Sequence, residues 1–278
     1  MRKENESKKS FLDSIIYFIV KVNNDDIFAL GAQLAYCLML SFFPFLIFLM
    51  TIVGFSRLNS ADILDGLGAI LPNNVFSLID TIVVEVVDTQ NAGLLGVSII
   101  ITIWSASSGF RAVIKGLNKA YDVRDSRSFI KRSFVAIVFT LGLATIIVLT
   151  LAMLVFGELI GEYILSIFPF EIDISTIWNL SRYLIVIFMM ILIFACMYRY
   201  TPAKKVPWRE VYPGAIVTTL GWIIVSLGFS YYINNIANYS RLYGGVGAVF
   251  VLMTWLYITS IILIIGAEFN SIVNRNRK

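Results

Sequence analysis

The chain contains no histidine and only two cysteines, and just 14% of its 278 residues are charged. Without histidine, it lacks the side chain that most often acts as a general base or metal ligand near neutral pH. Cys37 and Cys196 both lie inside apolar runs, where cysteine packs as a small hydrophobe, so no disulfide framework is expected. A soluble domain of this length would carry roughly 25% charged residues. The composition therefore excludes an ordinary soluble domain.

Long apolar runs dominate what is there, and hydrophobic residues make up 58% of the chain. About 20 apolar residues suffice for a helix to cross ~30 Å of hydrocarbon, and backbone polar groups in lipid must be satisfied within the segment. We therefore predict an all-α, polytopic membrane protein whose residues 29–270 form one bundle of six transmembrane helices. The predicted spans are about residues 29–54, 93–117, 133–157, 177–199, 212–234 and 243–269.

Two further segments have one polar and one apolar face at helical spacing. Residues 1–28, with Lys21 on the polar face, predict an N-terminal amphipathic helix along the cytoplasmic membrane surface. Residues 55–92 predict a second amphipathic helix on the outer face, between the first two spans, with a re-entrant segment as the alternative. Residues 271–278 are expected to form a basic cytoplasmic tail.

The lysines and arginines predict the direction of the chain across the membrane. If the N-terminus is cytoplasmic, all 22 of them except Arg57, Arg182 and Arg241 fall on the cytoplasmic side. Enrichment of this kind marks cytoplasmic loops. Both termini are therefore expected in the cytoplasm, and the net charge of +4 requires no nucleic-acid partner.

Polar side chains gather at the inner end of the second predicted span. On a helix, Trp104, Ser108, Arg111 and Asn118 form one stripe, and Ser105 belongs to an adjacent stripe of small residues that allows close helix contact. An ionised group in hydrocarbon costs at least about 2.5–3.5 kcal/mol. Arg111 is therefore expected to point into the bundle.

Other predicted spans bring polar side chains to the same depth, namely Gln33, Tyr36, Glu268 and Asn270. Because intramembrane charges usually pair, we predict an ion pair between Arg111 and Glu268. The alternative is that each charge reaches the lipid headgroups separately, or that Glu268 meets Arg275.

Deeper in the first span, the stretch "LSFFPF" contains Pro44, which cannot donate a hydrogen bond to the carbonyl of Leu40. The helix is therefore predicted to kink or open there, with Ser41 close enough to satisfy part of the break. Broken helices facing small polar residues form transport sites near the bilayer midplane. A kink that only improves packing is the alternative.

On the outer side, Glu158 and Glu162 share a helix face one turn apart, and Arg182 lies near the start of the next span. These three residues predict an outer ion pair. Two carboxylates are too few ligands to argue for a metal, so neither a metal nor a cofactor is expected.

Several motifs also carry a family resemblance: "AYCLMLSFFPF", "WSASSGFRAVIKGLNKAYDVRDSR", "YRYTPAKKVPWREVYPGA", "YGGVGAVFVLMTWLY" and "GAEFN". In this order and spacing they resemble the YihY/BrkB family of bacterial inner-membrane proteins, over about residues 25–272. The resemblance implies a six-span bundle in the bacterial plasma membrane. The family has carried the labels ribonuclease BN and virulence factor, and the resemblance by itself fixes no activity.

We predict a transporter or lipid translocase with a polar cavity open near the cytoplasmic side. Membrane lipids are the expected partners, and a small molecule or a lipid is the expected cargo. The candidate binding or gate residues are Gln33, Tyr36, Ser41, Pro44, Trp104, Ser105, Ser108, Arg111, Asn118, Glu268 and Asn270. A non-transporting membrane scaffold for envelope assembly is the alternative, and the oligomeric state stays open.

A ribonuclease is disfavoured on chemical grounds. Hydrolysis of a phosphodiester generally uses metal-held carboxylates or a histidine acid–base pair. The chain has no histidine, and its acidic residues are scattered without metal-ligand spacing. No catalytic residue and no enzymatic activity are therefore predicted.

Overall fold

A computed structural model describes residues 16–54, 92–142, 144–145, 174–235 and 247–275, and a few isolated positions between 61 and 84. Within these ranges the chain is helical or turns between helices, and no strand occurs. The all-α prediction is thus confirmed for the part of the chain that is described. The predicted outer amphipathic helix and the first 15 residues lie outside it.

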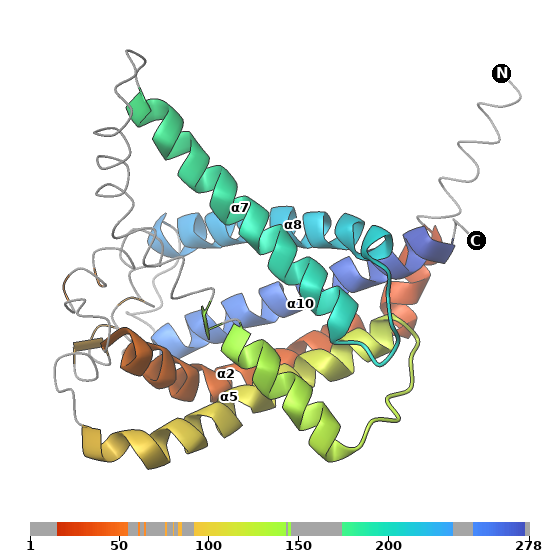
Figure 1. Ribbon diagram of the computed structural model, residues 1–278. Helices are drawn as coiled ribbons and strands as arrows, with labels where there is room; N and C mark the ends of the chain where they lie inside the picture. Colours follow the sequence, from red (N-terminus) through yellow and green to blue (C-terminus); the bar gives the residue numbers. More distant parts are fainter. Residues whose placement is uncertain are drawn as a thin grey trace, which may run out of the picture.

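Five long helices are labelled in Figure 1: α2 (Ile27–Gly54), α5 (Ala92–Ala120), α7 (Ile174–Tyr200), α8 (Trp208–Asn235) and α10 (Gly247–Arg275). Two shorter helical stretches cover residues 16–24 and 129–142. The long helices begin and end close to the first, second, fourth, fifth and sixth predicted spans. Of the third, 133–157, the structure describes residues only as far as 145.

Among the described residues, three segments are long and apolar enough to cross a membrane: Ile27–Ile47, Trp208–Ile233 and Gly247–Val273. Leu184–Tyr200 in α7 is a shorter apolar helix. Large apolar side chains also point outward, and Ile224 and Leu227 on α8 are each 68% exposed. Exposed apolar surface of this extent suits lipid rather than water. The count of six spans and the placement of both termini in the cytoplasm stay predictions.

The helices pack in pairs: α2 lies along α5, α10 packs against both α2 and α8, and α7 packs on α8. The apolar core between them consists of two clusters of buried side chains in the described part of the chain. Its largest fully buried side chains include Leu34, Ile114, Leu117, Leu252 and Ile264.

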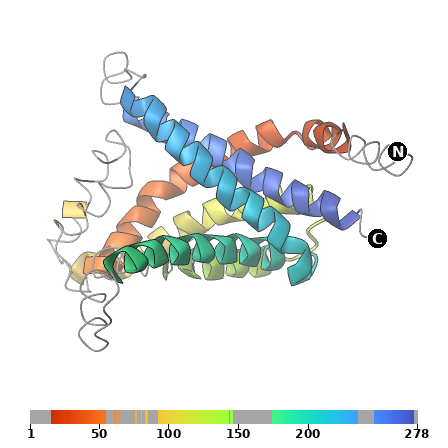
Figure 2. The same cartoon turned by 90° about the horizontal axis from the view of Figure 1, so that it is seen from above.

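One end of the bundle gathers charged side chains, and we call it the charged end. It consists of residues 16–26, 118–132, 199–209 and 268–275. In both views, the red helix at 16–24 and the blue end of α10 lie at this same end (Figures 1 and 2). Segments that are far apart in sequence therefore meet here.

The chain reverses direction sharply after α5. Asp122 adopts a left-handed backbone conformation with φ 53°, which aspartate tolerates better than most residues. The N–H of Asp122 donates to the Lys119 carbonyl, and the N–H of Val123 donates to the Asn118 carbonyl. This pair of bonds is a Schellman C-cap. It satisfies the last carbonyls of α5 and turns residues 123–128 toward the next helix.

Candidate functional site

Hydrogen bonds between small side chains fasten α2 to α5. Ser41 Oγ donates to the Cys37 carbonyl at 2.8 Å and accepts from the Gly109 N–H at 3.0 Å. The hydroxyls of Ser41 and Ser108 lie 3.0 Å apart. A Cβ at Gly109 would lie only 3.0 Å from Ser41 Oγ, so this position needs glycine for the helices to approach. Ser41 and Ser108 therefore meet in a helix–helix contact.

Three other candidates, Tyr36, Pro44 and Ser105, lie on α2 and α5. The predicted kink at Pro44 stays a prediction, whereas the helix does not open into two there, since α2 is continuous from Ile27 to Gly54. Tyr36 points outward and is 56% exposed. Ser105 lies within α5, and its side chain is outside the described part of the structure.

A cavity of about 590 Å³ opens at the charged end between α2, α5, the turn at 121–128 and the helix at 129–142. Four basic side chains and one acidic side chain contribute to its wall. The lining residues are Leu30, Arg111, Ile114, Lys115, Asn118, Lys119, Val123, Asp125, Phe129 and Arg132. We call it the Arg111 cavity. Two of the predicted binding residues, Arg111 and Asn118, line it.

The single carboxylate of the cavity, Asp125, is already neutralised. Arg127 donates to both of its oxygens, from Nε at 2.9 Å and from Nη2 at 3.0 Å. Arg132 Nε lies 3.4 Å from Oδ2. The hydrogen bonds from Arg127 hold the pKa of Asp125 below its usual value. The carboxylate therefore stays ionised and bound to Arg127. The remaining wall of the cavity therefore carries an excess of positive charge.

Asn118 ties the cavity to the turn between α7 and α8. Its Nδ2 donates to Asp125 at 3.1 Å, and its Oδ1 accepts from the Ala203 N–H at 2.7 Å. Arg127 Nη2 reaches the same turn and donates to the Thr201 carbonyl at 3.0 Å. These bonds satisfy Asn118 and fix the floor of the cavity against the rest of the bundle.

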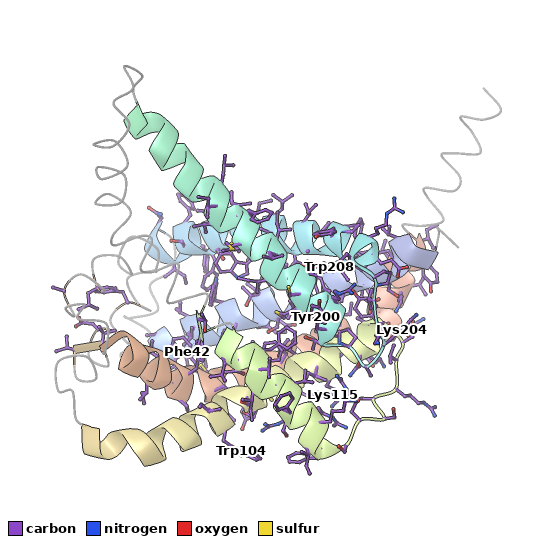
Figure 3. The ribbon with its side chains drawn as sticks, viewed as in Figure 1. Phe42, Trp104, Lys115, Tyr200, Lys204 and Trp208 are labelled. Atoms are coloured by element: carbon purple, nitrogen blue, oxygen red, sulfur yellow. The ribbon has the colours of Figure 1, made fainter. Side chains whose placement is uncertain are left out.

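Arg111 enters the cavity with spare hydrogen-bonding capacity. Its guanidinium carbon lies 5.3 Å from the centre of the Trp104 ring, within cation–π range. Its Nη1 is buried and has no hydrogen-bond partner among the described residues. One turn further along α5, Lys115 Nζ donates to Gln33 Oε1 at 3.0 Å. Figure 3 shows Trp104 on the outward side of α5, with Lys115 nearer the charged end.

The predicted ion pair between Arg111 and Glu268 is wrong. Glu268 Oε2 lies 2.8 Å from Lys21 Nζ instead. The reason is the rotation of α5 about its own axis. The face of α5 toward α10 carries Gly116, where an added Cβ would lie 3.6 Å from the Ile264 side chain. Five residues along a helix amount to a rotation of about 140°. Arg111 therefore points away from α10 although it lies at a similar depth.

Lys21 is the centre of a second, buried charge cluster, which we call the Lys21 cluster. Its Nζ lies 2.9 Å from Asp25, 3.2 Å from Asp122 and 2.8 Å from Glu268, and it donates to the Ala120 carbonyl at 3.1 Å. The side chain of Lys21 is 7% exposed and that of Glu268 is fully buried. Burial alone would lower the pKa of Lys21, but the contacts with these carboxylates raise it above its usual value. The lysine therefore stays charged.

Asn270 lies at the crossing of α8 and α10 and does not face the Arg111 cavity. Its Oδ1 accepts from the Gly214 N–H at 2.6 Å, and its Nδ2 donates to the Val211 carbonyl at 3.2 Å and to the Tyr121 hydroxyl at 3.1 Å. A Cβ at Gly214 would collide with the carbonyl of Gly266. The two helices thus touch backbone to backbone here, and Asn270 holds them together.

An aromatic cluster marks the turn between α7 and α8. The guanidinium of Arg199 lies 5.2 Å from the Tyr200 ring and 4.9 Å from the Trp208 ring, and Figure 3 shows both rings beside this turn, with Lys204 further out. Tryptophan and tyrosine collect at the membrane–water interface. The cluster is therefore consistent with an interface at the depth of the charged end.

The predicted outer ion pair cannot be placed. Glu158 and Glu162 lie outside the described residues, and for Arg182 only the helical backbone of α7 is described. The pair stays a prediction. In the part of the chain that the structure covers, no three His, Cys, Asp or Glu side chains are grouped so that they could hold a metal ion.

Sequence reasoning missed Lys21, Lys119, Asp125, Phe129 and Arg132 as members of either cluster. It used Lys119 and Arg132 only as evidence for topology. A signal for the cavity was present, because Arg111, Lys115 and Lys119 recur every four residues and so share one face of α5. No comparable signal pointed to Lys21.

These features define an all-helical membrane protein with a basic cavity at one end of its bundle. The chain belongs to the virulence factor BrkB family, whose model matches residues 18–278. It is similar to the ribonuclease-like protein YfkH of Bacillus subtilis, with 38% identity over 89% of this chain and 90% of that protein. A UPF0761 membrane protein of Alteromonas mediterranea is 25% identical over 91% of this chain and 84% of the relative. No solved structure matches the chain.

Proposed function

We propose that the chain is a transporter or lipid translocase of the bacterial plasma membrane, which takes up its cargo through the Arg111 cavity. The observation that carries the proposal is the surplus of uncommitted positive charge in that cavity, on a bundle that is otherwise apolar on its outside. A charged side chain near hydrocarbon costs free energy unless it pairs with an opposite charge or binds a ligand. Arg111 and Lys115 have no carboxylate within ion-pair distance in the described ranges.

The size of the cavity supports cargo of small-molecule or headgroup size. Its volume of about 590 Å³ falls within the roughly 300–1,000 Å³ typical of ligand pockets. The distribution of lysine and arginine supports a cytoplasmic position for the charged end and for both termini. Loading would then occur from the cytoplasmic side.

The name of the Bacillus relative raises nuclease activity as another function. The Arg111 cavity gives that activity no support: its only carboxylate is bound by Arg127, and the chain contains no histidine to act as acid or base. A membrane scaffold for envelope assembly is a simpler second candidate. In a scaffold, the basic cavity would serve packing alone.

The test is reconstitution of the purified protein into liposomes, with labelled phospholipid and with small solutes as separate cargoes. We expect movement of one cargo class above empty liposomes, and its loss in Arg111→Leu. Lys204→Gln is the matched control, because Lys204 lies at the charged end, is exposed and does not line the cavity. Inserted, folded protein that moves neither cargo class would refute the proposal and favour a scaffold.

A further inference from the structure

We infer that the Arg111 cavity binds the phosphate of an anionic membrane lipid, with the headgroup inside and the acyl chains along the adjoining apolar surface. This inference rests on the proposed function for the movement of the lipid, and it names the class of cargo. Four features support this inference. They are the excess of positive charge in the cavity wall, the orientation and unsatisfied donor of Arg111, the apolar surface beside the cavity, and the position of the cavity at the depth of the lipid headgroups.

The balance of charge favours an anion. Of the four basic residues of the wall, Arg132 is engaged by Asp125 at 3.4 Å, and Lys119 lies 4.0 Å from Asp25. Arg111 and Lys115 keep their charge free for a ligand. Basic pockets between transmembrane helices are the usual binding sites for anionic lipid headgroups.

Arg111 is held in a geometry suited to phosphate. The Trp104 ring, 5.3 Å from the guanidinium carbon, supports one face of the guanidinium. The buried Nη1 of Arg111 has no acceptor among the described side chains and backbone. A guanidinium presents two parallel N–H groups that fit two phosphate oxygens, which an ammonium cannot do. A bound phosphate would satisfy this donor.

The surface next to the cavity is apolar and outward-facing. Phe129 lines the cavity and is 60% exposed, and its ring centre lies 6.3 Å from that of Trp104. The next residue, Ile130, is 80% exposed, and Phe134, about one turn beyond it, is 66% exposed. A free phosphate would leave this surface without a partner, whereas the acyl chains of a lipid would cover it. The two parts together fit an amphiphile.

The depth of the site also fits a headgroup. The cavity lies at the charged end, level with the turn that carries the Arg199, Tyr200 and Trp208 cluster. Such aromatic clusters sit where headgroups meet hydrocarbon. A lipid in the cytoplasmic leaflet could therefore place its phosphate in the cavity without leaving its own layer.

The experiment measures lipid binding directly, by native mass spectrometry of the purified protein in detergent. Phosphatidylglycerol is titrated against phosphatidylcholine, and inorganic phosphate is tested as a competitor. We expect phosphatidylglycerol to bind preferentially, Arg111→Leu to weaken its binding about tenfold or more, and Lys115→Gln to weaken it about fivefold. Lys204→Gln should bind as the unmodified chain does.

Arg111→Lys guards against a folding defect, because it keeps the charge and loses only the two-pronged donor. It should bind more tightly than Arg111→Leu and less tightly than the unmodified chain. Equal binding of the two lipids, or equal binding by Arg111→Leu and Lys204→Gln, would overturn the inference. Competition by inorganic phosphate as strong as by phosphatidylglycerol would also overturn it and would assign the site to a soluble anion.

The two proposals can fail separately. Preferential binding of phosphatidylglycerol without movement in liposomes supports the lipid site and refutes transport. Movement of a solute or of phosphatidylcholine, without preferential binding of phosphatidylglycerol, supports transport and refutes the lipid site.

Discussion

The charged end contains two clusters that are built from similar side chains and differ in how their charges are balanced. In the Lys21 cluster, one ammonium meets three carboxylates, and Glu268 is fully buried. In the Arg111 cavity, four basic side chains line an open space with one carboxylate, which Arg127 already binds. The closed cluster joins the helix at 16–24 to α5 and α10. In the open cavity, Arg111 and Lys115 have no carboxylate within ion-pair distance among the described residues, so their charges are left for a ligand.

The packing around each cluster explains the difference. Two residues before Glu268, α10 touches α8 through Gly266 and Gly214, where a Cβ on either glycine would collide with a neighbouring atom. On the side of the cavity, the turn at 121–128 holds the helix at 129–142 away from α2, and the space between them stays open. Four substitutions test this difference between the two clusters.

Lys21→Met should have the largest effect. It removes the counter-ion of Glu268 at a fully buried position, and an uncompensated buried charge costs about 3–5 kcal/mol. Unfolding of the purified protein in mixed micelles, followed by tryptophan fluorescence, measures the loss. The double variant Lys21→Met with Glu268→Met should recover much of it. Unchanged stability of the single variant would show that the pair contributes nothing to folding.

Gly214→Ala should destabilise the protein by about 3 kcal/mol, at the upper end of the range for overpacking. The new methyl group would collide with the Gly266 carbonyl and with the Asn270 side chain. Gly228→Ala is the matched control, because it lies in the same helix and an added Cβ meets nothing within 4 Å. The control should be neutral or slightly stabilising. Equal effects of the two variants would contradict the close crossing.

Asp125→Asn should cost about 2 kcal/mol, because it replaces the charged acceptor of Arg127. Since Arg127 lowers the pKa of Asp125, the carboxylate stabilises the fold above its unfolded pKa of about 4. This contribution to stability is lost as the pH falls through the pKa of Asp125 in the folded protein, which is lower than its unfolded pKa. The stability difference between the unmodified chain and Asp125→Asn should thus be constant near neutral pH and shrink below about pH 4. A difference that does not depend on pH would argue against the ion pair.

Arg111→Leu should have the smallest effect on stability, under about 1 kcal/mol, because only the cation–π contact with Trp104 is lost. Its effect on lipid binding should be large by comparison. The same micelle unfolding measurement applies, with Lys21→Met in parallel. If Arg111→Leu destabilised the fold as much as Lys21→Met, the cavity would be a structural element like the Lys21 cluster.

Hydropathy and charge predicted the helices well, because both depend on local sequence. The ends of α2 and α5 lie within about three residues of the predicted spans 29–54 and 93–117. The cost of a charge in lipid predicted that Arg111 would be kept away from hydrocarbon, and in the structure Arg111 lines the cavity at the charged end. The predicted pairing of Arg111 with Glu268 was wrong, because the depth of a residue along a helix says nothing about the direction in which its side chain points around the helix.

Lys21 shows the same limit of sequence-based prediction. Its place on the polar stripe of an amphipathic segment predicted contact with water, yet its side chain is 7% exposed. The Lys21 side chain turns toward α5 and α10, where Asp122 follows the end of α5 and Glu268 lies within α10. Only the docking of three segments that are far apart in sequence creates this environment.

Local sequence is enough to predict that the described part of the chain is helical, with apolar side chains outside and most of its charges at one end, because hydrocarbon requires backbone groups to be satisfied locally and charges to be kept out. The tertiary structure alone decided that Glu268 binds Lys21 and that Arg111 is left free. Helix rotation and crossing, set by contacts such as Gly116 with Ile264 and Gly214 with Gly266, fix which charged side chains can meet.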